Sequence, residues 1–191
     1  MKLSIYINFI FLIIPACNIF EIRTPENPTQ QSSTFVQPVT PDIVIQNLKN
    51  SIEDYNIDNY IRCLSDPEVT GRTFKFIPAA VTGIDRAIFN NWTIESERQY
   101  LTNLGKPAYG RASLTLTNKR DVYVSSDSVI VNYDYSLFYP RTNQNYNAGG
   151  NLQFYISVDK NGSWSIYRWE DFNTTQSITW TYIKAIFSTG F

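Results

Sequence analysis

The chain has 191 residues, of which 43% are hydrophobic and 17% are charged, a composition that fits one folded domain with a short appendage and excludes a disordered polyelectrolyte. Its 16 basic and 17 acidic side chains nearly cancel, so we expect no nucleic-acid partner. Histidine is absent, which excludes a Ser-His-Asp triad and removes the commonest general base and most zinc sites. Because the sequence also has no glycine-rich phosphate loop and no metal-ligand cluster, we expect no cofactor and no metal.

An apolar run over residues 3–14 is the first feature along the chain. It has about a dozen residues, the length of a signal-peptide core, whereas a membrane-spanning helix needs about 20. The run ends in Ile-Pro-Ala-Cys at residues 14–17, which resembles the lipobox of bacterial lipoproteins, although Pro15 replaces the usual small residue. The resemblance implies a signal peptide over residues 1–16, acylation of Cys17 and attachment to the bacterial cell envelope, at the outer membrane if the cell has two. An ordinary signal peptide with an incidental cysteine is the alternative.

Residues 17–40 predict a tether that carries the lipidated cysteine. Three prolines lie there among Thr, Ser, Gln and Asn without any hydrophobic period. The segment Phe20 to Glu26 is more patterned than a spacer requires, and it resembles a segment that follows the lipidated cysteine in a group of bacterial lipoproteins. It is either part of a plain tether or a docking or sorting peptide. The folded domain is predicted over residues 41–191.

Helical patterns dominate the first part of this domain. Thr40 is a typical N-cap and Pro41 a typical first helical residue, while Asn56 begins a second helix and Gly105 ends a third. Cys63 lies on the apolar pattern of the second helix, where we expect a buried, inert thiol without a disulfide partner. The predicted helices cover about residues 41–52, 56–64 and 93–104.

Period-two alternation dominates the rest of the domain. A short strand is predicted near residues 74–78, and Asp-Lys-Asn-Gly at residues 159–162 is a hairpin turn between two of four longer strands. Trp164 is expected in the core between this sheet and the helices, and a short terminal helix is expected over residues 179–187. The four longer strands are predicted at about residues 112–117, 127–139, 152–158 and 164–171.

This order of elements resembles the nuclear-transport-factor-2-like (cystatin-like α+β cone) fold. The resemblance implies an α+β domain in which helices pack on a curved, mainly antiparallel sheet of four to six strands around a conical cavity. Such cavities serve isomerases, dehydratases and polyketide cyclases, and also non-catalytic binding and scaffold domains, so the fold alone selects no function. The residues that carry the resemblance are Leu48, Asp58, Tyr60 and residues 64–66, 74–78 and 162–171.

For an enzyme, the resemblance implies that an acid or a His-Asp pair in the cavity moves a proton, often with a tyrosine donor. Because the chain has no histidine, a carboxylate with tyrosine partners is the remaining option for acid-base chemistry. Asp134 lies between Tyr133 and Tyr135, and Glu170 and Asp171 follow Trp169. Alternation places Asp134 on the solvent-exposed face of its strand and both tyrosines on the face toward the core. We therefore expect no catalytic residue.

Arg168 has two interpretations. It follows Trp164 and Ile166 at period two and could point inward toward an anionic or carbonyl ligand, or it could form an ion pair with a carboxylate at a sheet edge. If the cavity binds a ligand, Tyr133, Tyr135, Arg168 and Trp169 are the candidate contacts.

Two functions follow from these patterns. The first is a membrane-anchored, non-enzymatic domain that binds a small apolar ligand or an envelope protein, with a homodimer as a further option. The second is a small cavity enzyme that moves a proton by carboxylate and tyrosine.

Overall fold

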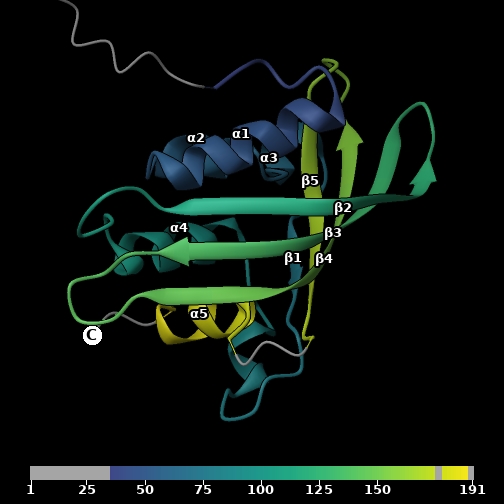
Figure 1. Cartoon of the computed structure of the whole chain (residues 1–191). Helices are drawn as coiled ribbons and strands as arrows, with labels where there is room; N and C mark the ends of the chain where they lie inside the picture. The colour runs from purple at the N-terminus through teal and green to yellow at the C-terminus, as the bar shows by residue number, and fades with distance from the viewer. Residues whose placement is uncertain (1–34, 175–177, 189–191) are drawn as a thin grey trace, which may run out of the picture. The chain divides into compact units, whose positions relative to one another are not determined.

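The computed structural model of the chain (Figure 1) describes residues 35–174 and 178–188. The predicted signal peptide, Cys17 and the segment Phe20 to Glu26 lie outside the described residues. The elements follow one another as α1 (Pro41–Glu53), α2 (Ile57–Arg62), α3 (Pro67–Thr70), β1 (Lys75–Ile77), the 3₁₀ turn η1 (Arg86–Phe89), α4 (Ile94–Leu104), β2 (Ser113–Val124), β3 (Ser128–Tyr139), β4 (Tyr146–Val158), β5 (Trp164–Phe172) and α5 (Trp180–Ile186).

The helices begin where their capping residues predict. The Thr40 hydroxyl accepts a hydrogen bond from the Ile43 amide at the start of α1. Thr93 caps α4, and Gly105 ends that helix with a positive φ that glycine adopts without strain. The second helix differs from expectation, because α2 ends at Arg62 and the Ser-Asp-Pro sequence starts a new helix, α3.

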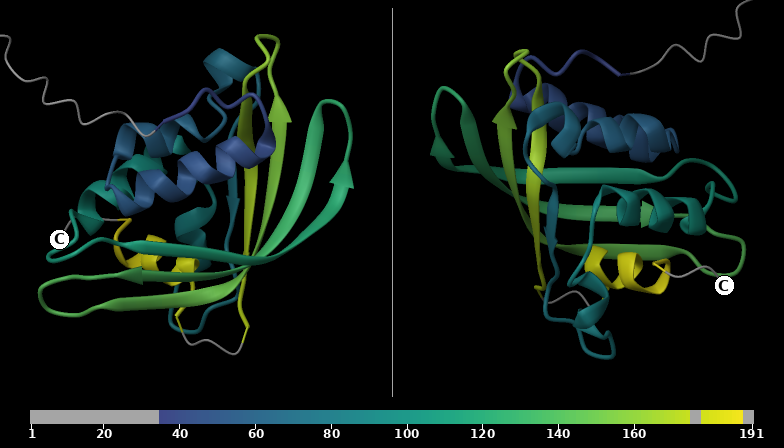
Figure 2. Two further views of the ribbon diagram at one scale, coloured as in Figure 1. Left: turned by 45° about the horizontal axis from the view of Figure 1, so that its top comes forward. Right: turned by 180° about the vertical axis from the view of Figure 1, so that it is seen from behind.

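A mixed sheet of five strands, in the order β1-β5-β4-β3-β2, confirms the predicted α+β class. Strand β1 runs parallel to β5, and all other neighbours are antiparallel. β2 continues past the predicted end at Thr117, and two register shifts against β3 explain why strict alternation does not extend there. In Figure 2, left, the sheet curves around the helices, which lie along one of its faces. The inner face and the helices enclose one hydrophobic core.

Residues 35–40, which the sequence places in the tether, pack against the domain. The buried Asn47 side chain accepts a hydrogen bond from the Val36 amide (2.9 Å) and donates one to its carbonyl (2.6 Å). The Pro38 carbonyl accepts from the Trp164 amide at 2.7 Å. These bonds satisfy polar groups that only the folded domain brings together, so no local sequence pattern marks them.

Trp164 does not lie in the centre of the core, contrary to the sequence expectation. It is the first residue of β5, is only half-buried and lines a surface pocket. Trp169 and Trp180 are the tryptophans with almost fully buried side chains. Tyr155 pairs with Arg168 whereas Ile156 pairs with Ile166, so β5 holds one extra residue at this point. This bulge shifts the phase of the strand and turns Trp169 inward.

Candidate functional site

A buried ion pair lies inside the curved sheet. Lys184 of α5 and Glu97 of α4 contact each other through Nζ and Oε1, and both side chains are 0% exposed. The same carboxylate accepts hydrogen bonds from the Trp92 indole (2.7 Å) and the Tyr60 hydroxyl (2.8 Å). Both oxygens of Glu97 are therefore occupied by protein donors, as a buried charge requires.

Four aromatic rings surround the Lys184 ammonium. Its Nζ lies 3.9 Å from the ring centroid of Phe76, 4.0 Å from Trp169, 5.3 Å from Tyr100 and 6.0 Å from Trp92. Ring faces attract a cation, and the attraction grows when water is excluded. Burial nevertheless lowers the pKa of Lys184 to about 8, although the Glu97 charge opposes the shift.

Asp171 of β5 is the centre of a second buried network. Its Oδ1 accepts from the Tyr135 hydroxyl (2.9 Å), and its Oδ2 accepts from the amide (2.7 Å) and hydroxyl (2.6 Å) of Thr181. The Tyr135 hydroxyl in turn accepts from the Trp180 amide (2.7 Å). Burial raises the pKa of Asp171 against these hydrogen bonds, which lower it.

Helix α5 therefore fills the inside of the curved sheet. Trp180, Thr181 and Lys184 all come from this helix and are buried: Trp180 and Lys184 contact α4 through Tyr100 and Glu97, and Thr181 contacts Asp171 of the sheet. The two inner carboxylates, of Glu97 and Asp171, are held by donors of the protein itself. Carboxylates and tyrosines are residue types that can transfer protons. In this arrangement, however, both carboxylates are buried and bonded to protein donors, so a substrate in solvent cannot contact them.

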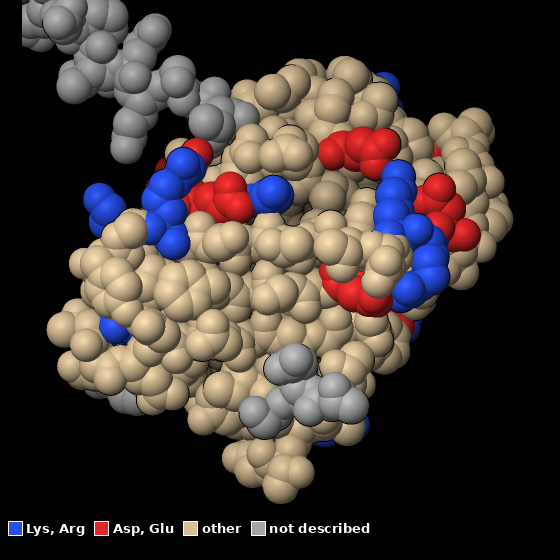
Figure 3. Space-filling view, in the orientation of Figure 1, with Lys and Arg blue, Asp and Glu red and all other residues tan. Residues whose placement is uncertain are grey.

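Asp134 lies on the outer face of the sheet, as alternation predicts. Its carboxylate accepts from Asn118 (2.6 Å), Arg120 (2.9 Å) and Asn151. The hydrogen bond from Asn118, followed by that from Arg120, lowers the pKa of Asp134. It is one of several carboxylates with a basic neighbour, and Figure 3 shows acidic and basic side chains gathered in mixed groups on the face it displays.

Arg168 also lies on the outer face, because the bulge in β5 turns Trp169 to the core instead. Arg168 forms an ion pair with Glu170 and stacks 4.9 Å from the ring centroid of Tyr155. The ion pair that the second interpretation predicts is present, and the side chain does not point inward. The pair does not lie at a sheet edge, however, because β5 has β4 and β1 on its two sides.

The remaining candidate ligand contacts are core residues. Tyr133, Tyr135 and Trp169 are buried, the tyrosines on β3 and the tryptophan on β5. They do not meet Arg168 around one solvent-open cavity, since its guanidinium stacks on Tyr155 whereas their side chains belong to the hydrophobic core.

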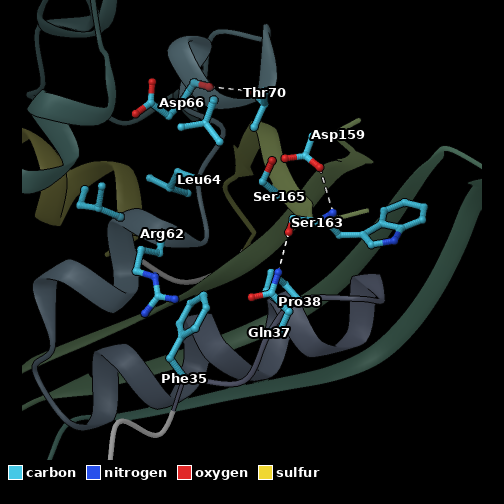
Figure 4. A pocket seen from close by; sticks show the side chains of 13 residues that line it. Phe35, Gln37, Pro38, Arg62, Leu64, Asp66, Thr70, Asp159, Ser163 and Ser165 are labelled. Carbon is cyan, nitrogen blue, oxygen red and sulfur yellow. Dashed lines mark hydrogen bonds between the residues drawn. The ribbon is translucent and has the colours of Figure 1, made fainter. Parts of the chain in front are cut away.

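A pocket of about 270 Å³ opens at one end of the sheet instead (Figure 4). Its walls come from the segment before α1, from α2, α3 and the residues between them, and from the β4–β5 hairpin. Apolar side chains provide much of the lining, namely those of Phe35, Pro38, Ile61, Leu64, Val69 and Trp164. Sequence reasoning missed this site because its walls are about 100 residues apart in the chain and share no motif.

Polar groups line this pocket on both sides, with Arg62, Asp66 and Thr70 in the α2–α3 region and Asp159, Ser163 and Ser165 on the hairpin. The Ser163 hydroxyl accepts a hydrogen bond from Gln37 (2.7 Å), and Asp159 accepts from the Ser163 amide (2.9 Å). The hydroxyl of the buried Ser165 has no hydrogen-bond partner in the described structure. In Figure 4 these side chains lie across the pocket from Arg62, whose guanidinium stacks 3.7 Å from the ring centroid of Phe35. The pocket therefore combines an apolar wall with the charged groups of Arg62, Asp66 and Asp159, and the unpartnered Ser165 hydroxyl is enclosed in its wall.

Cys63 is a buried free thiol, as predicted. Its Sγ donates to the Asn59 carbonyl at 3.2 Å, and burial raises the pKa of the thiol. Within residues 35–174 and 178–188, no cluster of three or more acidic or cysteine side chains could hold a metal ion. No helix in the same part of the chain is both long and apolar enough to cross a membrane.

No protein-family model and no curated protein matches the sequence. Solved structures do match its fold. A candidate scytalone dehydratase from Novosphingobium aromaticivorans is 12% identical, with a TM-score of 0.54 over 70% of this chain and 81% of that one. The beta subunit of benzoate 1,2-dioxygenase from Burkholderia mallei is 11% identical, with a TM-score of 0.51 over 69% of this chain and 86% of that one.

A third structure carries the name of the fold. It is a nuclear-transport-factor-2-like protein of unknown function in nutrient uptake from Rhodospirillum rubrum, 9% identical, with a TM-score of 0.53 over 70% of this chain and 97% of that one. Enzymes and proteins without an assigned reaction are thus both similar to this chain in architecture. From its elements and its structural neighbours, the chain has the nuclear-transport-factor-2-like fold.

Proposed function

We propose that this chain is a non-enzymatic binding domain, held at the bacterial envelope by a lipid on Cys17, whose ligand site is the pocket between the α2–α3 region and the β4–β5 hairpin. The position of helix α5 is the observation that favours binding over catalysis. Helix α5 places Trp180 and Lys184 inside the curved sheet, where the cavity enzymes implied by the resemblance would hold a substrate. The inner carboxylates then serve to hold that helix.

The chemistry of the pocket supports a small, mainly apolar ligand with one polar group. A volume of about 270 Å³ is near the lower end of small-molecule sites, which begin at roughly 300 Å³. Leu64 and Phe35 provide apolar contact area, and the unpartnered Ser165 hydroxyl favours a ligand that brings a hydrogen-bond partner.

A pocket-filling substitution tests the site. Val69 lines the rim and is 57% exposed, so Val69→Lys should fold normally while its longer, charged side chain blocks the pocket. With p-cresol as the probe, ¹H–¹⁵N spectra of the wild type should shift at Leu64 and Ser165, and Val69→Lys should weaken binding by about tenfold or more.

The matched control is Val122→Lys, since Val122 is 56% exposed and lies on β2, outside the pocket lining. It should bind p-cresol like the wild type. Equal loss in both variants, or shifts confined to other parts of the domain, would contradict the proposed site. Toluene, which lacks the hydroxyl, should bind more weakly than p-cresol if Ser165 contributes a hydrogen bond.

The lipid anchor is tested separately, because it rests on the sequence at residues 14–17. Expressed in a bacterium, the chain should yield a mature N-terminus at Cys17 that carries acyl chains, detected by intact-mass and peptide mass spectrometry. Cys17→Ser should abolish the acyl mass and release the protein from the membrane fraction. An unacylated N-terminus downstream of Cys17 in the wild type would reject the anchor while leaving the pocket proposal intact.

A further inference from the structure

The outer edge of β1 borders a groove of about 630 Å³. β1 stands at the end of the strand order, so β5 pairs with one of its edges and no described strand pairs with the other. Six consecutive residues, 73–78, line the groove along this edge, and residues of η1 and of the turn before α4 form the facing wall. The groove therefore follows the backbone of an extended segment, which is the geometry that a further strand needs.

The charge of the groove has one sign. Lys75 and Arg86 are the ionisable side chains among the residues that line it, and both are exposed. Neither is in any ion pair identified within the described residues. A partner with carboxylates would complement these cations, whereas a basic partner would be repelled.

The alternation of β1 specifies where those carboxylates would lie. Phe76 points into the core, and Lys75 and Ile77 point to the opposite, outer face. An added strand would place every second side chain beside Lys75 and Ile77, and the others toward the wall that holds Phe89 and Trp92. A partner segment that fits this edge therefore alternates, with acidic side chains on the outer face beside Lys75 and apolar side chains on the inner face.

We propose that the groove beside β1 binds an extended acidic segment of a partner protein by strand addition. Edge strands with a lysine, a following proline and only three residues usually resist pairing. Here these features limit the partner to a short segment, because Pro78 has no amide hydrogen to donate and Arg86 donates to its carbonyl (3.3 Å). The interaction is accordingly weak and selective by charge.

The test uses the full-length chain, labelled with ¹⁵N, and two synthetic pentapeptides. The acidic peptide is acetyl-Glu-Val-Glu-Val-Glu-amide, and its basic counterpart has Lys in place of Glu. The acidic peptide should shift the amide signals of Lys75, Ile77 and residues 89–92, and the basic peptide should bind about tenfold more weakly or not at all.

Charge reversal supplies the matched variants. Lys75→Glu combined with Arg86→Glu should abolish binding of the acidic peptide and allow the basic one to bind, with an unchanged melting temperature because both side chains are exposed. Lys106→Glu changes an exposed lysine outside the groove and should leave both affinities unchanged.

Three results would overturn the proposal. The first is equal affinity for the two peptides. The second is that the peptide shifts amide signals elsewhere but not those of β1. The third is a shift of the Lys75 and Ile77 signals with protein concentration in the absence of peptide, which would assign the edge to a second copy of the chain. The groove and the p-cresol pocket have no lining residue in common, so failure here leaves the ligand site untouched.

Discussion

Lys184→Met is expected to lower the free energy of unfolding by about 3–5 kcal/mol at neutral pH, measured by urea denaturation. The substitution keeps an unbranched side chain inside the ring of Phe76, Trp92, Tyr100 and Trp169, but it leaves the Glu97 carboxylate buried without a cation. An uncompensated charge at 0% exposure is among the most destabilising single changes that a core can receive.

The double variant Glu97→Gln with Lys184→Met is the control. The amide oxygen of glutamine can accept from the Trp92 indole, and its N–H can donate to the Tyr60 hydroxyl, so both groups keep a hydrogen bond to this side chain, with Tyr60 now the acceptor. We expect the double variant to recover most of the lost unfolding free energy. In a buried ion pair, the attraction between the charges does little more than offset the cost of removing both from water, so replacing both by neutral groups costs little. If Lys184→Met is as stable as the wild type, the side chain is not enclosed as the structure places it.

The same lysine predicts a pH dependence. Its pKa is about 8 in the folded chain and 10.5 when unperturbed, so between these values the unfolded chain binds the proton that the folded chain has lost. The free energy of unfolding therefore rises with pH between these two pKa values. As pH falls back through this window to about 8, the same increment of stability is lost. Comparison of wild type with Lys184→Met between about pH 7.5 and about pH 9.5 isolates the effect, since tyrosines ionise above that range.

Trp169→Ala is expected to cost about 3–5 kcal/mol of unfolding free energy. The indole is fully buried and its ring centroid lies 4.5 Å from that of Trp180, 5.0 Å from Phe154 and 5.8 Å from Phe76. Its Nε1 has no hydrogen-bond partner among the described residues, so the loss comes from packing and from the contact with the Lys184 ammonium.

Trp164→Ala provides the comparison with another tryptophan on the same strand. Because its side chain is half-buried at the pocket rim, we expect a loss of less than about 1.5 kcal/mol. Trp169→Phe should fall between the two, since it keeps a ring beside the ammonium. A larger effect at Trp164 than at Trp169 would contradict the burial of Trp169 and the partial exposure of Trp164.

Local chemistry made several elements predictable. Thr40 and Asn56 cap helices in the structure as their side chains predict, because capping is decided within a few residues of the chain. The alternation of β3 placed Asp134 outside and Tyr133 and Tyr135 inside, since a strand without bulges keeps its period. The order of these elements was sufficient for the fold.

The sequence also contained a signal for the buried pair. Lys184 lies on the apolar face of α5 with Trp180, Ile183 and Phe187, and Glu97 lies on that of α4 with Leu101. A charged side chain on an apolar helix face at spacings of three and four residues indicates burial with a partner. It does not identify that partner, because Glu97 and Lys184 are separated by 87 residues.

By itself, then, the sequence determined the fold class, the caps of α1 and α2, the end of α4 at Gly105 and the outer-face position of Asp134, all of which depend on neighbours along the chain. Only the tertiary structure decided that α5 fills the curved sheet, that the bulge at Tyr155 and Ile156 sends Arg168 outward, and that residues 35–40 help to wall the pocket. Those features depend on the register between strands and on contacts between distant segments. Such contacts follow from how the whole core packs, which no local pattern specifies.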